Sequence, residues 1–302
     1  MRIYPRKVKL KGYGRDNAIK ILGQGDQHTD DPGHIPKAFD AFLEAVAKAP
    51  EGSGAFLLGD PFSFANTRSQ RAFLKMFPEA TEDAQESVDG FVREMAKPVR
   101  KKLETIKDRI WGTVEGNHGW TFRDGTTVDH RIADLLGVIW SDGMLICHVA
   151  LETPPSGGGM GLNIVCHHGA TAAQTTAGDI NSLIKHAGYF SNAHIVMEGH
   201  THGLSVTPDE RMVIVNSRTE IKLKHQICWT ARCGGAVRGY RQGSASYPER
   251  RMLKPTMPGH VEFTVWLEKP RMGKTRQTKR ELHLCIEGRV VPLQGVSVGV
   301  AG

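Results

Sequence analysis

The sequence predicts an α/β fold in which two packed β-sheets are flanked by helices. Short apolar runs end at a glycine followed by a polar residue, as at 18–25 (AIKILGQG) and 54–60 (GAFLLGD), and helical segments lie between them. The runs are apolar throughout rather than alternating, which indicates sheets covered on both faces. The chain has 302 residues, which is long enough to bury the hydrophobic core of one large domain or of two modest ones.

The spacing of apolar residues places the individual elements. Helices are expected at 36–49, 81–110, 128–137 and about 172–187, and Pro98 should kink or divide the second of them. Strands are expected near 18–25, 54–60, 111–119, 162–166 and 193–198. The segment 138–151 is typical of a hairpin with its turn at 141–143, and residues 203–267 alternate as short strands.

Composition favours a soluble protein of the reducing cytoplasm. The basic N-terminus lacks the apolar stretch of a secretory signal, and no run of about 18 apolar residues could span a membrane. The five cysteines are odd in number and form no CxxC pair, so we expect no disulfide framework. We interpret them as small apolar residues of strands.

The net charge of +7 is concentrated in three basic clusters, at 2–20, 97–109 and 269–280. The last holds six basic residues and no acid. Such clusters attract polyanions, so a nucleic acid is one expected partner. A solvated, flexible surface is the alternative for any one cluster.

Two residue pairs have the spacing of metal ligands. Asp26 and His28, and likewise His200 and His202, are two positions apart, so in extended chain both side chains of a pair point to one side. Imidazole and carboxylate together suit Zn, Mn or Fe.

Three further signals follow strands in the same way. These are Asp60 after Gly59, Asn117-His118 after Gly116, and His167 after the strand at 162–166. Each has a structural alternative: a helix cap, a left-handed turn or a hydrogen-bonded core histidine. Five such signals in order at strand ends predict a metal site where open α/β folds place their sites.

The ordered motifs resemble the calcineurin-like metallophosphoesterase superfamily. They are GDQH (25–28), GD (59–60), GNH (116–118), HH (167–168) and GHTH (199–202), and the resemblance covers residues 18 to about 215. It implies a four-layer α/β/β/α sandwich of two mixed β-sheets flanked by helices. The corresponding domain would span 18–268 with a helical insertion at about 62–110, between a basic arm (1–17) and a basic extension (269–302).

The resemblance also implies a dinuclear metal centre. One ion would take Asp26, His28 and His202; the other would take Asn117, His167 and His200; and Asp60 would bridge them, with a water or hydroxide shared between the ions. Two divalent cations are therefore expected as cofactors, Mn²⁺ first, with Fe, Zn, Ni and Mg as alternatives.

His118 would lie beside the ions as a general acid or as a clamp on a phosphate oxygen. Of the two adjacent histidines, His167 is expected to be the ligand, because strand neighbours face opposite sides and the family uses the first residue after the strand. His168 would then contact substrate or be structural.

Two departures from the family concern the partner that orients His118. The family commonly has an acid where Gly119 stands, and its second motif often ends in an acid where this chain has Ser63.

These features predict metal-dependent hydrolysis of a phosphoester, with a phosphodiester, nucleic acid or nucleotide substrate favoured, as in phosphodiesterases and nucleases. The alternatives are a phosphomonoesterase or protein phosphatase, and a binding module that keeps the fold without catalysis.

Overall fold

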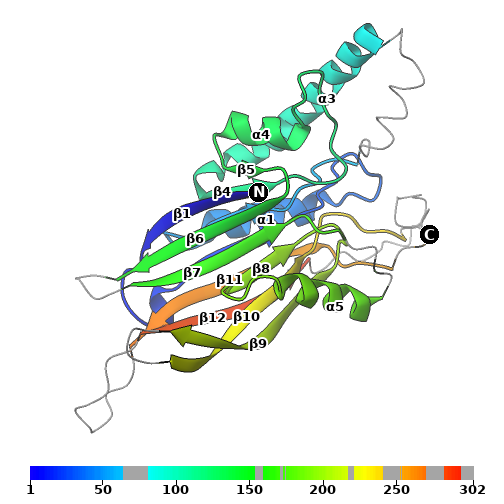
Figure 1. Ribbon diagram of the computed structural model, residues 1–302. Helices are drawn as coiled ribbons and strands as arrows, with labels where there is room; N and C mark the ends of the chain where they lie inside the picture. Colours follow the sequence, from blue (N-terminus) through cyan, green and yellow to red (C-terminus); the bar gives the residue numbers. More distant parts are fainter. Residues whose placement is uncertain are drawn as a thin grey trace, which may run out of the picture.

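Two six-stranded sheets form the centre of the molecule, shown in Figure 1. The computed structural model describes residues 1–63, 81–153, 159–170, 173, 175–216, 221–240, 252, 254–269 and 282–293. Structural statements below concern these residues.

The first sheet has the order β1-β6-β7-β8-β10-β9. Its strands are β1 (Arg2–Lys9), β6 (Met144–Glu152), β7 (Gly159–His167), β8 (Ile195–Glu198), β10 (Ile221–Cys233) and β9 (Leu204–Asn216). The pairs β6/β7 and β10/β9 are antiparallel, and the other three neighbouring pairs are parallel. The sheet is therefore mixed.

The second sheet has the order β12-β11-β2-β3-β4-β5. Its strands are β12 (His283–Pro292), β11 (Gly259–Glu268), β2 (Ile19–Gln24), β3 (Gly54–Leu57), β4 (Ile110–Val114) and β5 (Trp140–Ser141). The four strands from β2 to β5 run parallel, so the carboxyl ends of β2, β3 and β4 lie at one edge of the sheet.

Helices cover the outer faces of both sheets. The buried side chains of α1 (Pro36–Lys48), α3 (Thr81–Glu104) and α4 (Val128–Leu136) share one core with the outer face of the second sheet. Those of α5 (Thr176–Ala187) pack on the outer face of the first sheet, and a third core fills the space between the sheets. Short 3₁₀ turns lie at Arg15–Asn17 and Lys107–Arg109. The predicted four-layer α/β/β/α sandwich is confirmed.

Local chemistry explains where the helices begin and end. Pro36 begins α1, a position at which its missing N–H is not needed. Thr127 caps α4 by accepting a hydrogen bond from the His130 N–H, and Gly137 ends this helix in the left-handed conformation at φ 69°.

α3 is one continuous helix of 24 residues with Pro98 inside it, so Pro98 does not divide it. Two sequence predictions about the other elements were wrong. The segment 138–151 is not a hairpin, because β5 pairs with β4 in one sheet and β6 pairs with β1 and β7 in the other. The turn at 141–143 thus carries the chain between sheets, and the Ser141 hydroxyl donates to the Met144 carbonyl across it. Where the stretch 203–267 is described, its strands are β9, β10 and β11, with 13, 13 and 10 residues rather than short ones.

Both predicted terminal extensions contain a strand. β1 lies within the stretch predicted as a basic arm and pairs with β6 over eight residues. β12 lies within the predicted C-terminal extension and completes the second sheet beside β11. Of the basic cluster at 269–280 only Lys269 is described, and its Nζ lies 4.2 Å from the centre of the Tyr13 ring.

All five cysteines are free thiols located in strands, as the sequence predicts: Cys147, Cys166, Cys228, Cys233 and Cys285. Within the described ranges, no helix is both long and apolar enough to cross a lipid bilayer.

His260 gives stability a pH dependence that can be measured. It is buried in β11 against the Phe42 ring at 5.6 Å, and burial lowers its pKa to about 4. Glu262 opposes this shift, whereas Arg289 and Lys20 add to it. The unfolded chain therefore takes up a proton on His260 below its ordinary pKa of about 6.5 while the folded chain does not.

Stability should accordingly fall as pH drops from about 6.5 towards 4, with His260 contributing roughly 3 kcal/mol of the loss. Urea unfolding across this range should be less pH-dependent in His260→Leu than in the parent protein. An identical pH slope in the two proteins would contradict a neutral, buried His260.

Candidate metal centre

Candidate ligands converge at one edge of the sandwich because each follows the carboxyl end of a strand. Asp26 and His28 follow β2, Asp60 follows β3 and Asn117 follows β4 in the second sheet. His168 follows β7, and His200 and His202 follow β8, in the first sheet. The site therefore lies at the edge of the sandwich where the carboxyl ends of these strands, from both sheets, are close together.

Asp26, His28 and His202 form a first group of candidate ligands. Their ligand atoms lie within 4.8 Å of one another. The Nε2 atoms of the two histidines are 3.1 Å apart, and each lies 3.9 Å from Asp26 Oδ1. The two rings stack with their centres 4.9 Å apart.

A second group surrounds the side-chain oxygen of Asn117. Its Oδ1 lies 2.8 Å from His168 Nε2 and 3.0 Å from His200 Nδ1. Asp60 Oδ2 lies 3.1 Å from His168 Nε2 and 4.0 Å from His28 Nε2. Asp60 therefore lies between the two groups, where a bridging ligand would be.

The structure brings His168, not His167, into this cluster, which corrects the sequence prediction. In β7, Leu162, Ile164 and Cys166 face the core between the sheets. Because side chains alternate, His168 continues this inward face and His167 points to the opposite side. There His167 Nδ1 accepts a hydrogen bond from the Gly169 N–H at 2.8 Å.

The backbone at the candidate ligands is unusual. Seven non-glycine residues of the described chain have positive φ, and five of them are candidate ligands: Asp26 (50°), His28 (41°), Asp60 (55°), His200 (69°) and His202 (54°). This left-handed conformation is unfavourable for a side chain and concentrates at functional sites. The residues with a strained backbone are therefore the same ones that the sequence motifs identify.

Glycines make room for Asp60. A Cβ on Gly116 would stand 1.9 Å from Asp60 Oδ1, and a Cβ on Gly59, at φ 83°, would stand 2.4 Å from the Gly116 backbone nitrogen. In this space the His118 N–H donates to Asp60 Oδ1 at 2.8 Å. The GD and GNH motifs thus pack directly against each other.

Burial keeps three of the histidines neutral. It lowers the pKa of His28 and of His200 to about 4 each, and that of His202 well below its ordinary value. A metal ion binds neutral imidazole, so these rings have the required protonation state at neutral pH.

Burial and neighbouring charges also shift the pKa values of Asp26, Asp60 and His168. Burial raises the pKa of Asp26 to about 8. For Asp60, burial alone would raise the pKa, but the adjacent His168 outweighs it and holds the pKa below its usual range. For His168, burial opposes a stronger effect of Asp60, which raises the pKa to about 10.

Two candidate ligands are oriented by hydrogen bonds that the sequence analysis did not identify. The His168 Nδ1–H donates to the Leu58 carbonyl at 2.6 Å, which directs Nε2 towards Asp60. Ser63 Oγ lies 2.9 Å from His28 Nδ1, and the Ser63 N–H donates to Asp30 Oδ1. Metal-binding histidines are commonly fixed in this way through their second ring nitrogen. Ser63 stands at the position where the family often has an acid.

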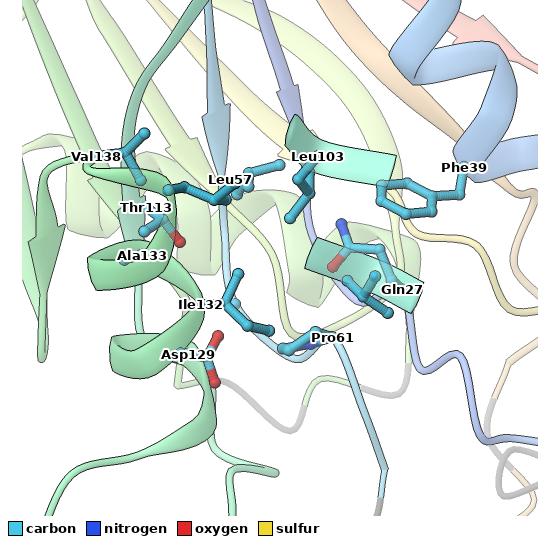
Figure 2. Close-up of a pocket in the computed structure, with 13 residues that line it drawn as sticks. Gln27, Phe39, Leu57, Pro61, Leu103, Thr113, Asp129, Ile132, Ala133 and Val138 are labelled. Atoms are coloured by element: carbon cyan, nitrogen blue, oxygen red, sulfur yellow. The ribbon is translucent and has the colours of Figure 1, made fainter. Parts of the chain in front are cut away.

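His118 lies beside the first group, with its ring centre 5.4 Å from that of His28. The missing side chain of Gly119 leaves space towards Asp129 of α4, whose Oδ2 lies 3.5 Å from where a Cβ would be. Asp129 lines a small cavity of about 20 Å³ with Gln27 and Pro61, shown in Figure 2. Burial holds the pKa of Asp129 well above its usual range.

A buried ion network supports the loop that carries His200 and His202. Arg232 of β10 is fully buried and contacts Asp179 at 2.8 Å and Glu198 at 2.5 Å. Asp179 also accepts a hydrogen bond from the Thr201 hydroxyl and pairs with Lys254. Thr201 stands between the two histidines, so its hydrogen bond to Asp179 ties their loop to the ion network.

The donor set fits divalent metal ions. Both side-chain oxygens of Asp26 are buried, and no side chain among the described residues donates a hydrogen bond to either of them, which is costly unless a cation is bound there. Two imidazole nitrogens 3.1 Å apart, facing this carboxylate, form a mixed N/O set that suits Mn, Fe or Zn.

Comparison with known proteins gives only distant similarity. No protein-family model and no curated protein matches the sequence. Among solved structures, the chain is similar to a double mutant of Vps29 from Entamoeba histolytica, with 13% identity and a TM-score of 0.34 over 91% of this chain and 99% of that one. Wild-type Vps29 complexed with zinc, from the same organism, has 12% identity and a TM-score of 0.33 over 91% of this chain and 99% of that one.

A predicted phosphoesterase from Streptococcus pneumoniae gives 12% identity and a TM-score of 0.31 over 91% of this chain and 98% of that chain. These identities and TM-scores are too low to assign an activity to this chain.

Proposed function

We propose that this chain is a metal-dependent phosphoesterase that hydrolyses a phosphodiester, with a nucleic acid or nucleotide as the favoured substrate. The observation that carries the proposal is the position of Asp60 Oδ2 between the group at His28 and the group at His168. Seven side chains supply ligand atoms for two ions there: Asp26, His28, Asp60, Asn117, His168, His200 and His202.

Two divalent ions in such a site supply Lewis-acid activation of the phosphoryl group and a water of lowered pKa. The protein's contribution is charge and orientation. Only two of the seven ligands, Asp26 and Asp60, are carboxylates, so the loaded site stays positive towards a phosphate. The His118 imidazole lies beside this site and donates a proton to the leaving oxygen. Mn²⁺ is the proposed ion.

A binding module without catalysis is the second candidate function, favoured by Gly119, which removes the acid that the family has beside the general acid. The buried Asp26 carboxylate and the five left-handed residues argue against it, since both are costly features that a scaffold without a metal does not need.

The preference for a nucleic acid rests on the basic clusters. In the cluster at 2–20, Lys11, Arg15 and Lys20 pair with Glu51, Glu287 and Glu262, so part of its charge is neutralised locally. The cluster at 269–280, which has six basic residues and no acid, is the proposed contact for a phosphate backbone. A cytoplasmic location belongs to the same proposal and is supported by five free thiols.

A substrate panel tests the function. The protein loaded with Mn²⁺ should hydrolyse bis-p-nitrophenyl phosphate and one or more of single-stranded DNA, double-stranded DNA, RNA and cyclic nucleotides. Faster hydrolysis of p-nitrophenyl phosphate than of every diester would identify a phosphomonoesterase. Absence of hydrolysis with Mn, Fe, Ni and Zn would establish the binding module.

The adjacent histidines provide a matched pair of variants. His168→Ala should weaken metal binding by more than the roughly 10–100-fold typical for loss of an outer partner, and should reduce hydrolysis accordingly. His167→Ala should retain the metal content and turnover of the parent protein, because its ring lies on the other side of the strand. Elemental analysis and the diester assay check both, and the reverse result would restore the sequence-based assignment of His167.

A further inference from the structure

A groove between α3 and α4 has no part in the proposed active site. Its volume is about 570 Å³. One wall is a stripe along α3 that includes Arg93, Lys97, Arg100, Lys101 and Glu104, at helical spacing. This stripe extends over three turns, or about 16 Å.

The opposite wall is mainly apolar. α4 contributes Val128, Ile132 and Leu135, again at helical spacing, together with Arg131, and Ala96 and Phe122 complete the lining. Leu135 is 64% exposed, whereas Val128 and Ile132 lie deeper, at 1% and 6%. The groove therefore offers an apolar seam beside a basic rim.

The charge of the rim is only partly neutralised. Arg93 pairs with Glu86 and Lys97 with Glu94. Among the described residues, neither Arg100 nor Lys101 has an acidic partner, and Arg100 Nε is buried without a hydrogen bond. These two cations lie next to each other at the same end of the stripe, where they can receive carboxylates from a ligand.

We propose that this groove binds an acidic amphipathic helix of a partner protein. A helix laid between α3 and α4 would place apolar residues at i, i+3, i+4 and i+7 against Leu135 and Ile132. Glutamates or aspartates on its flank would pair with Arg100 and Lys101. The length of the stripe matches about three turns of such a helix.

A single-stranded nucleic acid fits the groove less well. Such ligands stack bases on exposed aromatic rings along a basic track. The aromatic residue of this groove, Phe122, is 3% exposed, and the Arg131 guanidinium lies 3.9 Å from its ring centre. Arg131, the cation that α4 contributes to the groove, is already paired with Asp124 at 2.7 Å, which leaves it less available to a phosphate backbone.

The test uses a fluorescent helical peptide of about 14 residues with leucines at i, i+3, i+4 and i+7 flanked by glutamates, and fluorescence anisotropy as the readout. The full-length protein should bind it saturably. Lys101→Glu and Leu135→Asp should each weaken binding by about tenfold or more. Both side chains are exposed, so circular dichroism and the melting temperature should match those of the parent protein.

Matched controls distinguish binding in the groove from non-specific attraction to the protein's positive charge. Lys107→Glu makes the same charge change in the same basic cluster outside the groove and should leave the affinity unchanged. Glu104→Lys removes the acid of the rim and should tighten binding. A peptide with lysines in place of the glutamates should not bind.

Absence of saturable binding by the acidic peptide would overturn the proposal. So would an equal loss of affinity in Lys107→Glu and Lys101→Glu. A single-stranded oligonucleotide that displaces the peptide and is itself weakened by Lys101→Glu would make the groove a nucleic-acid surface instead. The binding readout needs no hydrolysis, so its result is independent of the proposed catalytic function.

Discussion

Asp60→Asn is expected to leave the purified protein with little bound metal and no measurable diester hydrolysis. The Asp60 carboxylate lies between the ligand groups of both ions, and an amide can neither supply its negative charge nor bridge two cations through two equivalent oxygens. His202→Ala, by contrast, removes a ligand of the first group alone and should mainly weaken one ion. Elemental analysis of protein loaded with Mn²⁺ measures both outcomes.

Asp129→Asn is the matched control for this substitution. Asp129 is another buried acid close to the site, but it contributes no ligand atom to either group. Its near-isosteric change to Asn should therefore preserve both the fold and the metal content. Parental metal stoichiometry in Asp60→Asn would refute the bridging role.

The second large effect is expected at His118. His118→Ala should retain both ions but lose about 10²–10⁴-fold in turnover, the usual contribution of a general acid. The loss should be smaller for p-nitrophenyl leaving groups, which depart without protonation, than for alkyl leaving groups. Steady-state rates for the two substrate types, with metal content measured in parallel, provide the comparison.

Equal losses for both leaving groups would assign His118 to positioning a phosphate oxygen rather than to proton transfer. Loss of metal in His118→Ala would make it part of the ligand set. Each result therefore identifies one specific role for this ring.

The layers of the fold and most of the site could be predicted from the sequence because both depend on local patterns. Buried strands appear in the sequence as apolar runs, and a glycine followed by Asp, Asn or His marks the point where each strand ends. The motifs at 25–28, 59–60, 116–118 and 199–202 therefore placed Asp26, Asp60, Asn117 and His200 correctly at one edge.

The assignment of His167 failed although the signal was present. Leu162, Ile164 and Cys166 alternate with the polar Asn163, and this alternation alone places His168 on the core face. The sequence analysis recognised that only one of the two histidines could face the metals but did not extend the alternation to position 168.

Other features could not be predicted because they depend on contacts between distant segments. β5 and β6 are separated by two residues, yet they belong to different sheets, because each strand pairs with a neighbour far along the chain. The hydrogen bond from His168 to the Leu58 carbonyl and the ion network of Arg232 likewise join segments about 110 and 50 residues apart. No local pattern records such contacts.

Anomalous X-ray diffraction from crystals grown with Mn²⁺ tests the central claim most directly. A dinuclear centre should give two peaks about 3.5–4 Å apart, one among Asp26, His28 and His202 and the other among Asn117, His168 and His200, with Asp60 between them. A single peak, or a peak beside His167 on the outer face of β7, would contradict the dinuclear site described by this geometry.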